Sequence, residues 1–295
     1  MAIQAVAANR SATLLQAKAG GRRTLVDRAM RYLSFVAAIV CIIPLAAVLF
    51  FVTVRGIAAV NIDLLTKPAR ALGVGGGALS AILGTLQMVP LAALMAIPIG
   101  VLAGIYIHEY GSARSARVIR FAADVLVGVP SILIGIFVFT FLVLPFRQYN
   151  AFAGSVALAV IMSPVIMRTT EEVLKLVPGT LREASLALGV PRWRTTLSIV
   201  VRTALPGILT GIMLAVARAA GETAPLLFTA LGSRLVNVGD LTKPMDALPL
   251  FIYVNARQPF ELQNEQAWGA AFLLLVFVLT VNVLVRLRSA GTRTQ

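Results

Sequence analysis

Six apolar stretches constrain this sequence more than any other feature. A helix needs about 20 residues to cross roughly 30 Å of hydrocarbon. Hydrophobic residues are 59% of the chain and charged residues only 13%, which is more apolar surface than a water-soluble domain buries. We therefore predict an all-α polytopic membrane protein with about six transmembrane helices. The predicted spans cover residues 33–54, 82–107, 121–146, 152–167, 205–231 and 268–287.

Prolines interrupt several of these spans. The second span contains Pro90 and Pro98, the third contains Pro130, and the fourth is short and ends near Pro164. Membrane helices tolerate proline where neighbouring groups satisfy the freed carbonyls. We expect kinks at these positions, and we regard the fourth span as the weakest of the six.

Lysine and arginine are distributed unevenly between the two sides of the membrane. The side with both termini, loop 108–120 and loop 168–204 carries 18 of the 26 basic residues, whereas the opposite side carries seven. This bias predicts that both termini are cytoplasmic. The net charge of +14 does not indicate nucleic acid as a partner, because the basic residues are spread over short loops.

The predicted organisation has three parts. Residues 1–32 form a cytoplasmic tail, expected to be disordered; residues 33–287 form the permease domain; residues 288–295 form a cytoplasmic C-terminal tail. The first span is too long and begins too late to be the apolar region of a signal peptide, which has about 7–15 residues. We expect it to be retained.

The loop at residues 168–204 contains a predicted helix. Leu181, Ser185, Leu188 and Gly189 follow spacings of three and four, which predicts one stripe on a helix. Gly189 and Pro191 then end it. A capped helix in a cytoplasmic loop favours contact with a partner.

Several kinds of site are excluded. The chain has no G-x-x-x-x-G-K-[S/T] motif, so it does not hydrolyse a nucleotide through a P-loop. His108 is the only histidine and Cys41 the only cysteine, so no His- or Cys-based metal site is expected. We predict no cofactor, no metal and no catalytic residue.

Arg218 and Glu222 lie near the middle of the fifth predicted span. A charge at that depth costs about 2.5–3.5 kcal/mol on insertion scales, and the i, i+4 spacing puts both side chains on one helix face. The pair is either a buried structural ion pair or part of an anion path with Glu222 beside the guanidinium, and we favour the path. A guanidinium suits oxyanions because it donates two parallel hydrogen bonds, without distinguishing phosphate from sulfate.

A second charged cluster begins at the end of the fourth span. Arg168 is either an inner-mouth anion contact or an interfacial residue that extends its charge to water, and the sequence leaves both open. Glu171, Glu172 and Lys175 are interpreted as a solvated helix face or contacts to a partner.

The loop helix resembles the EAA loop of ABC importer permeases, in which E-A-A is followed after three residues by glycine. Here Glu183, Ala184 and Ser185 precede Gly189, with serine at the third position in place of alanine. The resemblance implies a type I importer permease whose coupling helix docks on an ATP-hydrolysing subunit.

A closer resemblance is to the phosphate-specific permeases of the Pst system, in particular the PstA type. It rests on ARAAGETAPLLFTA and on the stretches GTLQMVPLAALMAIPIGVLAGIYIHEY and SPVIMRTTEEVLKLVPGTLREAS. It implies phosphate import with a PstC-like second permease, a PstB-like ATPase dimer and a PstS-like phosphate-binding protein, in a bacterial inner membrane. Matched position by position, the resemblance implies that Arg218, Glu222 and Arg168 line the translocation path. It also implies that Glu183 and Gly189 belong to the coupling helix.

Three alternatives were weighed. Another oxyanion importer, for sulfate or molybdate, has similar chemistry, but the GETAPLLF string favours phosphate. Inverted repeats in the hydropathy pattern would favour a secondary transporter or a channel. The sequence shows no clear inverted repeat. An intramembrane enzyme needs convergent catalytic groups, which Arg218 and Glu222 alone do not supply.

Overall fold

The computed structural model describes residues 2–71 and 73–291 of the chain, and most of these residues are helical. The described residues contain no strand beyond one isolated parallel bridge between Leu231 and Met245. The all-α prediction is confirmed. The α-helices are α1 (Ala2–Ala59), α2 (Ile62–Thr66), α3 (Leu79–Ile105), α4 (Ala113–Gly128), α5 (Ser131–Val138), α6 (Ala151–Lys175), α7 (Gly179–Ala187), α8 (Arg192–Thr195), α9 (Val201–Ala220), α10 (Ala224–Thr229), α11 (Leu248–Asn255) and α12 (Glu261–Gly291). Three π-helical turns, η1 (Tyr106–Tyr110), η2 (Phe139–Val143) and η3 (Thr196–Val200), follow α3, α5 and α8.

Residues up to Val54 form a first compact unit, which is the main part of helix α1. The expected disorder of the N-terminal tail is wrong, because α1 is helical from Ala2. Alanine has the highest helix propensity, and this tail is rich in alanine. The segment from Arg23 is long and apolar enough to cross a membrane and buries none of its apolar window within the chain. Residues 292–295 of the predicted C-terminal tail lie outside the described residues.

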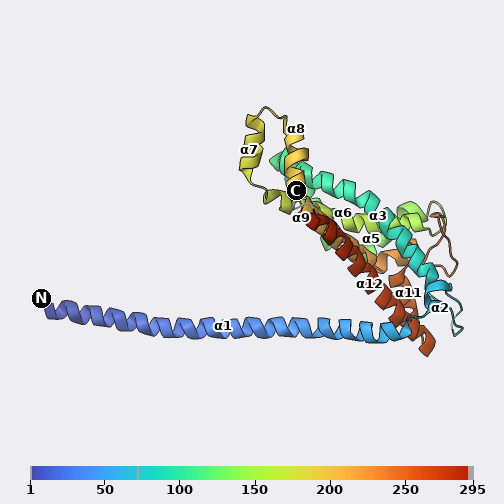
Figure 1. Ribbon diagram of the computed structural model, residues 1–295, viewed down its shortest axis with the longest axis horizontal. Coiled ribbons are helices and arrows are strands. Elements are labelled where there is room, and N and C mark those ends of the chain that lie inside the picture. The colour runs from blue at the N-terminus through green and yellow to red at the C-terminus, as the bar shows by residue number, and fades with distance from the viewer. Residues whose placement is uncertain (1, 72, 292–295) are drawn as a thin grey trace. The chain divides into compact units, whose positions relative to one another are not determined.

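The second unit, from Arg55 onward, is built around helices α3, α6 and α9, which lie side by side (Figure 1). Glycines allow these helices to approach closely. A Cβ at Gly100 would lie 2.7 Å from the Cβ of Ile166, and one at Gly104 would lie 2.7 Å from the Cβ of Thr170. Both pairs have the same residue offset, so α3 and α6 run parallel.

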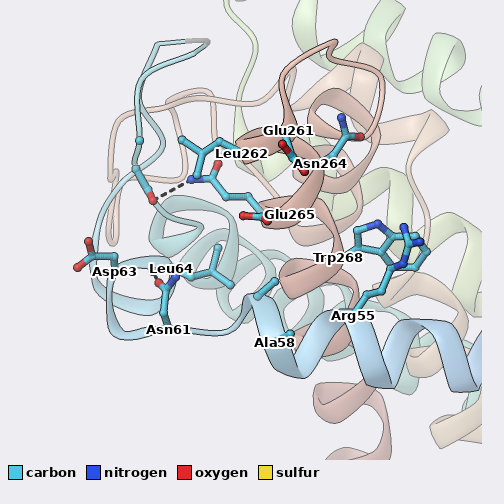
Figure 2. A pocket seen from close by; sticks show the side chains of 14 residues that line it. Arg55, Ala58, Asn61, Asp63, Leu64, Glu261, Leu262, Asn264, Glu265 and Trp268 are labelled. Atoms are coloured by element: carbon cyan, nitrogen blue, oxygen red, sulfur yellow. Dashed lines mark hydrogen bonds between the residues drawn. The ribbon is translucent and has the colours of Figure 1, made fainter.

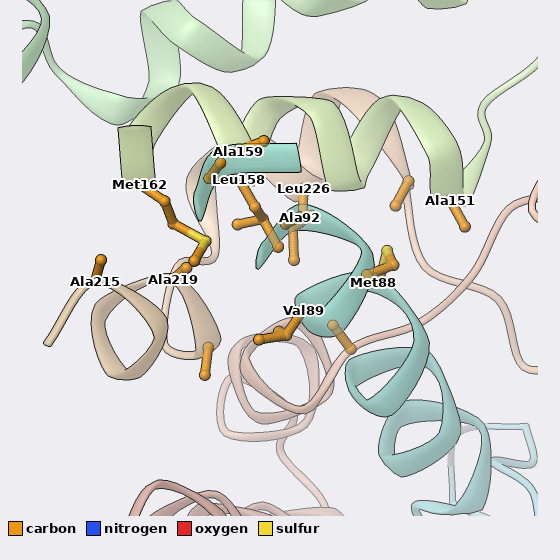
Figure 3. Packing of buried hydrophobic residues seen from close by; sticks show 14 of the residues in the cluster. Met88, Val89, Ala92, Ala151, Leu158, Ala159, Met162, Ala215, Ala219 and Leu226 are labelled. Atoms are coloured by element: carbon orange, nitrogen blue, oxygen red, sulfur yellow. The ribbon is translucent and has the colours of Figure 1, made fainter. Parts of the chain in front are cut away.

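Helix α9 runs antiparallel to α6. Gly207 faces Val173, whereas Gly211, one turn later, faces Thr169, one turn earlier on α6. The core between these helices consists of small and apolar side chains, among which Met162 extends toward Ala219 (Figure 3). Its fully buried large members include Met88, Leu158, Met162, Ile166 and Leu226.

Five described helical segments are long and apolar enough to cross a membrane, and one bent pair makes up to six. The bent pair is α4 with α5, which meet at an angle of 102°. Pro130 caps α5 and lacks the amide that a continuous helix would need. The predicted kink at Pro130 is confirmed, although the helix before it begins at Ala113 and not at residue 121.

Two predicted spans differ from the structure. The fourth is longer than expected, because α6 extends for 25 residues with Pro164 inside it, although it has the lowest mean hydropathy of the five single-helix candidates. The fifth is not continuous over residues 205–231: a helical segment from Arg192 ends at Ala220, and α10 begins at Ala224. Pro225 in the first turn of α10 cannot donate to a preceding carbonyl, so the helix breaks before it.

Candidate functional site

The predicted coupling segment is the short helix α7, which contains all three residues of the EAA-like motif. Gly189 follows it with a φ of +78°, a conformation that glycine adopts without steric cost. The amide of Gly189 donates to the carbonyl of Leu186 at 2.9 Å, which satisfies one of the free carbonyls at the helix end. The prediction that Gly189 ends this helix is confirmed.

The predicted coupling residues do not share one face. Glu183 and Ala184 are exposed, and the carboxylate of Glu183 has no hydrogen-bond or ion-pair partner among the described residues. Ser185 is buried, with its Oγ 2.8 Å from Oγ1 of Thr195 in α8. Leu188 is 84% exposed. The single stripe predicted from the sequence is wrong, because Leu188 leaves the helical path as the C-cap while Ser185 turns toward α8.

Arg182 fixes α7 to the end of α3. Its Nη2 lies 2.8 Å from Oε1 of Glu109 and 3.1 Å from Nε2 of His108, and its Nη1 donates to the carbonyl of Val177 at 2.8 Å. Glu109 is only 8% exposed, so the guanidinium neutralises a buried carboxylate. His108 is part of this cluster.

Arg192 makes a second connection to the same place. It donates to the carbonyl of Glu109 and lies over the ring of Tyr110, 5.2 Å from its centroid. The hydroxyl of Tyr110 in turn donates to Thr196 at 3.2 Å. These contacts join residues more than 70 positions apart, so no local sequence pattern predicts them. The one visible signal in the sequence is the charge of Glu109 at the end of a span.

Glu171 is fully buried at the same end of the unit. Arg120 of α4 and Lys175 of α6 each donate to its Oε1 at 2.7 Å. The prediction that Glu171 lies on a solvated face or contacts a partner is wrong, because α4 folds across it. A buried carboxylate of this kind is tolerated only with such partners.

Arg168 lies beside this cluster and is ion-paired with Asp124 of α4. Its Nε donates to Oδ1 of Asp124 at 2.9 Å, and its Nη1 lies 3.6 Å from Oε2 of Glu171. The guanidinium is therefore occupied by two carboxylates. No local sequence pattern indicates Asp124 as its partner, because the two residues are 44 positions apart.

Arg218 and Glu222 lie at the break between α9 and α10. Arg218 is in the last turn of α9, next to Ala219, which packs on Met162 in the middle of α6 (Figure 3). Arg218 therefore lies level with the middle of α6, and the pair flanks a helix end and not a continuous helix. The Nε of Arg218 lies 3.5 Å from Oε1 of Glu222. The side chain of Arg218 is 47% exposed and that of Glu222 is 16% exposed.

A cavity of about 570 Å³ lies where α1, α2 and α12 meet (Figure 2). Its lining includes the carboxylates of Asp63, Glu261 and Glu265. Arg55 lies over the indole of Trp268, 5.4 Å from the ring centroid. Because three carboxylates outnumber one guanidinium, this cavity repels anions, and it is not a candidate for an oxyanion path.

Residues 96–293 match the family described as "Binding-protein-dependent transport system inner membrane component". The chain is 42% identical over 266 residues to the phosphate transport system permease protein PstA of Pasteurella multocida, covering 90% of this chain and 95% of that protein. It is 42% identical to the PstA of Haemophilus influenzae, covering 88% and 93%. It is 40% identical to PstA 1 of Mycobacterium tuberculosis, covering 89% and 88%.

The fold resembles the permease chain in inward-facing structures of the MetNI methionine ABC transporter. One such chain has a TM-score of 0.59 and 18% sequence identity, covering 72% of this chain and 95% of that one. At this identity the likeness shows the fold of an ABC importer permease and nothing about substrate. The chain therefore belongs to the binding-protein-dependent inner-membrane transport components and, among them, to the PstA permeases.

Proposed function

We propose that this chain is a membrane-spanning permease subunit of an ATP-driven phosphate importer and that Arg218 contacts the anion in the translocation path. One observation carries the path assignment: a half-exposed guanidinium lies level with the middle of α6. A charge facing lipid at that depth is costly, so this face must lie against water or another subunit. The names of the similar permeases support phosphate as the substrate.

The chemistry of the pair supports this role. Among the described residues, the Nη groups of Arg218 have no hydrogen-bond partner, and the contact to Glu222 is long. The two Nη donors are free to form the paired hydrogen bonds that an oxyanion accepts. Glu222 restrains the guanidinium of Arg218. Because Glu222 and the anion are both negatively charged, Glu222 also keeps Arg218 from binding the anion too tightly.

Arg168 is proposed as a second contact nearer the cytoplasm. Its pairing with Asp124 and Glu171 keeps it from an anion in this conformation. We propose that it exchanges these carboxylates for the anion when α4 moves relative to α6, because only a change of partner frees its donors.

The coupling role belongs to the segment around α7. Glu183, Ala184 and Gly189 are exposed and available to an ATPase, whereas Ser185 is proposed to hold α7 against α8 through Thr195. The helical segment from Arg192 to Ala220 is continuous and ends next to Arg218. A displacement at α7 therefore reaches the anion contact through one stiff element.

The assembly proposed is a PstC-like permease beside this chain, a PstB-like ATPase dimer under the α7 loops, and a PstS-like binding protein on the opposite face. The uneven distribution of basic side chains supports a cytoplasmic position for both termini and for the loop 168–204. Residues 1–32 and 288–295 are then cytoplasmic tails, and residues 33–287 are the permease domain.

Phosphate uptake by the complete complex in proteoliposomes tests the proposal. Arg218→Ala is expected to lower uptake at least on the order of a hundredfold, since charged hydrogen bonds are worth about 1.5–3 kcal/mol each. The variant should co-purify with the ATPase as well as the wild type does. Arg257→Ala is the matched control, because Arg257 is an exposed arginine that contacts only Tyr253.

Normal uptake by Arg218→Ala would remove Arg218 from the path. Wild-type uptake of sulfate or molybdate in place of phosphate would replace the substrate by another oxyanion. Uptake that needs no ATP would instead indicate a secondary transporter or a channel.

A further inference from the structure

A second cavity, of about 200 Å³, lies at the end of the unit opposite α7. It is large enough for a small anion with a few waters, since one water takes about 30 Å³. Leu227 and Leu231 line it from α10 and its end. Helix α10 starts two residues after Glu222 and is six residues long, which corresponds to about 9 Å. The cavity is therefore at the far end of the element that begins at the Arg218–Glu222 break.

Two arginines flank this cavity. Arg70 and Arg234 are both exposed lining residues, and neither forms an ion pair or hydrogen bond with any other described residue. Ser233 lies between them in the lining, and its Oγ accepts from the amide of Leu235 at 3.2 Å, which leaves its hydroxyl proton free to donate. These groups are all donors, as an anion requires.

Asp246 is the buried ionisable group that lines the same cavity. It is 8% exposed, and its Oδ1 accepts from the amide of Ala247 at 2.8 Å. It lies in the loop before α11, outside the spanning helices, and burial raises its pKa to about 7. A carboxyl group in this state is protonated often enough near neutral pH to donate a hydrogen bond.

The elements packed around Asp246 bring few charges to it. Helix α3 presents Gly84, and the loop after α10 presents Gly232. Among the described lining residues the only other charged groups are Arg70 and Arg234. Lys243 and Asp240, in the same loop as Asp246, pair with each other at 3.0 Å and do not line the cavity.

The backbone at the cavity mouth is strained. Leu231 has a φ of +60° and Gly232 has a φ of +80°, and Leu231 forms a bridge with Met245. A leucine in this region costs on the order of 1–3 kcal/mol, and such strain concentrates at functional sites. Here it turns the chain so that Ser233 and Arg234 line the cavity together with Asp246.

We propose that this cavity is an outer anion site, in which Arg70, Arg234 and Ser233 hold a small phosphate-type oxyanion and the protonated carboxyl of Asp246 donates to one of its oxygens. This proposal rests on the proposed import function. An imported anion would bind at this site before it reaches Arg218. Ionisation of Asp246 places a negative charge beside the anion and releases it. The site thus binds best when Asp246 is neutral.

Uptake of radiolabelled phosphate by the complete complex with its binding protein, measured from about pH 6 to about pH 8, tests the site. Asp246→Asn is permanently neutral, so the ratio of wild-type to variant uptake at subsaturating phosphate is expected to fall about tenfold over this range, following the protonated fraction. Dividing wild-type uptake by variant uptake at each pH cancels the pH effects that come from the titration of phosphate and of the other subunits. Asp240→Asn should show no such fall.

Arg70→Gln with Arg234→Gln is the second measurement. It is expected to lower uptake on the order of tenfold or more while leaving unchanged the concentration of binding protein that half-stimulates ATP hydrolysis. A rise in that concentration would show that the arginines contact the binding protein and would overturn the site. A flat pH ratio with normal wild-type uptake would overturn it as well, whereas a wild-type complex that moves no phosphate refutes the import function itself.

Discussion

At the residue scale, the charged side chains of this permease fall into two groups. Glu109 and Glu171 are buried, and each is neutralised by arginine or lysine. Arg218 keeps free donors at a helix break. Buried carboxylates are thus paired within the chain, whereas Arg218, the proposed anion contact, is left incompletely paired.

The buried carboxyl of Asp246 gives a prediction about stability. Its pKa is raised from 3.8 to about 7, so the folded state holds this proton more tightly than the unfolded state does. Stability is therefore lost as the pH rises from about 4 to about 7 and stays lower above that range. The loss is roughly 4 kcal/mol at most, at about 1.4 kcal/mol for each pKa unit.

Asp246→Asn removes this ionisation and keeps an acceptor for the amide of Ala247. We expect its melting temperature, measured in detergent without phosphate, to exceed that of the wild type by a margin that grows from pH 5 to pH 8. Asp240→Asn is the control, because Asp240 is partly exposed and paired with Lys243. A constant margin across this pH range would show that Asp246 does not ionise with a raised pKa.

At the element scale, the end of α7 depends on one backbone conformation. A Cβ at Gly189 or at Gly179 would meet no atom within 4 Å, but only Gly189 has a positive φ. Alanine at Gly189 is therefore expected to strain the loop by about 1 kcal/mol or more without any steric clash. We expect Gly189→Ala to weaken co-purification of the ATPase and to lower the ratio of phosphate moved to ATP hydrolysed.

Gly179→Ala is the matched variant and is expected to leave both measurements unchanged, since alanine favours the first turn of a helix. Equal effects of the two substitutions would contradict the conformational explanation. Normal coupling in both would mean that α7 does not need its present end to contact the ATPase.

The elements also show where sequence reasoning succeeded and failed. The end of α7 at Gly189 and the kink at Pro130 were predictable, because both depend on local backbone chemistry. The break at Gly221 was missed, although Pro225 was visible, because membrane helices often accommodate proline. Hydropathy alone does not tell a kink from a complete break.

At the scale of the whole molecule, close approach of α3, α6 and α9 depends on glycines that face the neighbouring helix. A Cβ at Gly104 would lie 2.7 Å from Thr170 Cβ and 2.8 Å from the carbonyl oxygen of Met167. Gly104→Ala must therefore move one helix relative to the other, at a cost of about 1–3 kcal/mol. We expect a clear fall in the melting temperature of the purified chain.

Gly128→Ala is the control, because a Cβ at Gly128 would meet no atom within 4 Å. It should leave the melting temperature unchanged or raise it slightly, since alanine is the better helix former. If Gly104→Ala were equally harmless, the α3–α6 contact would be looser than its geometry indicates.

The sequence by itself determined the all-α membrane fold, the positions of most spans, the short loop helix α7 with its glycine end, and the charged pair Arg218–Glu222. These features follow from hydropathy, local backbone chemistry and the cost of charge in hydrocarbon, all of which act over short stretches of chain. Only the tertiary structure decided that Glu171 is buried, that Arg168 pairs with Asp124, that Arg182 fixes α7 to Glu109, and that Asp246 and Arg70 line one cavity. Each of these depends on which helices cross and at what depth, and a linear pattern of residue types does not encode partners more than 40 positions apart.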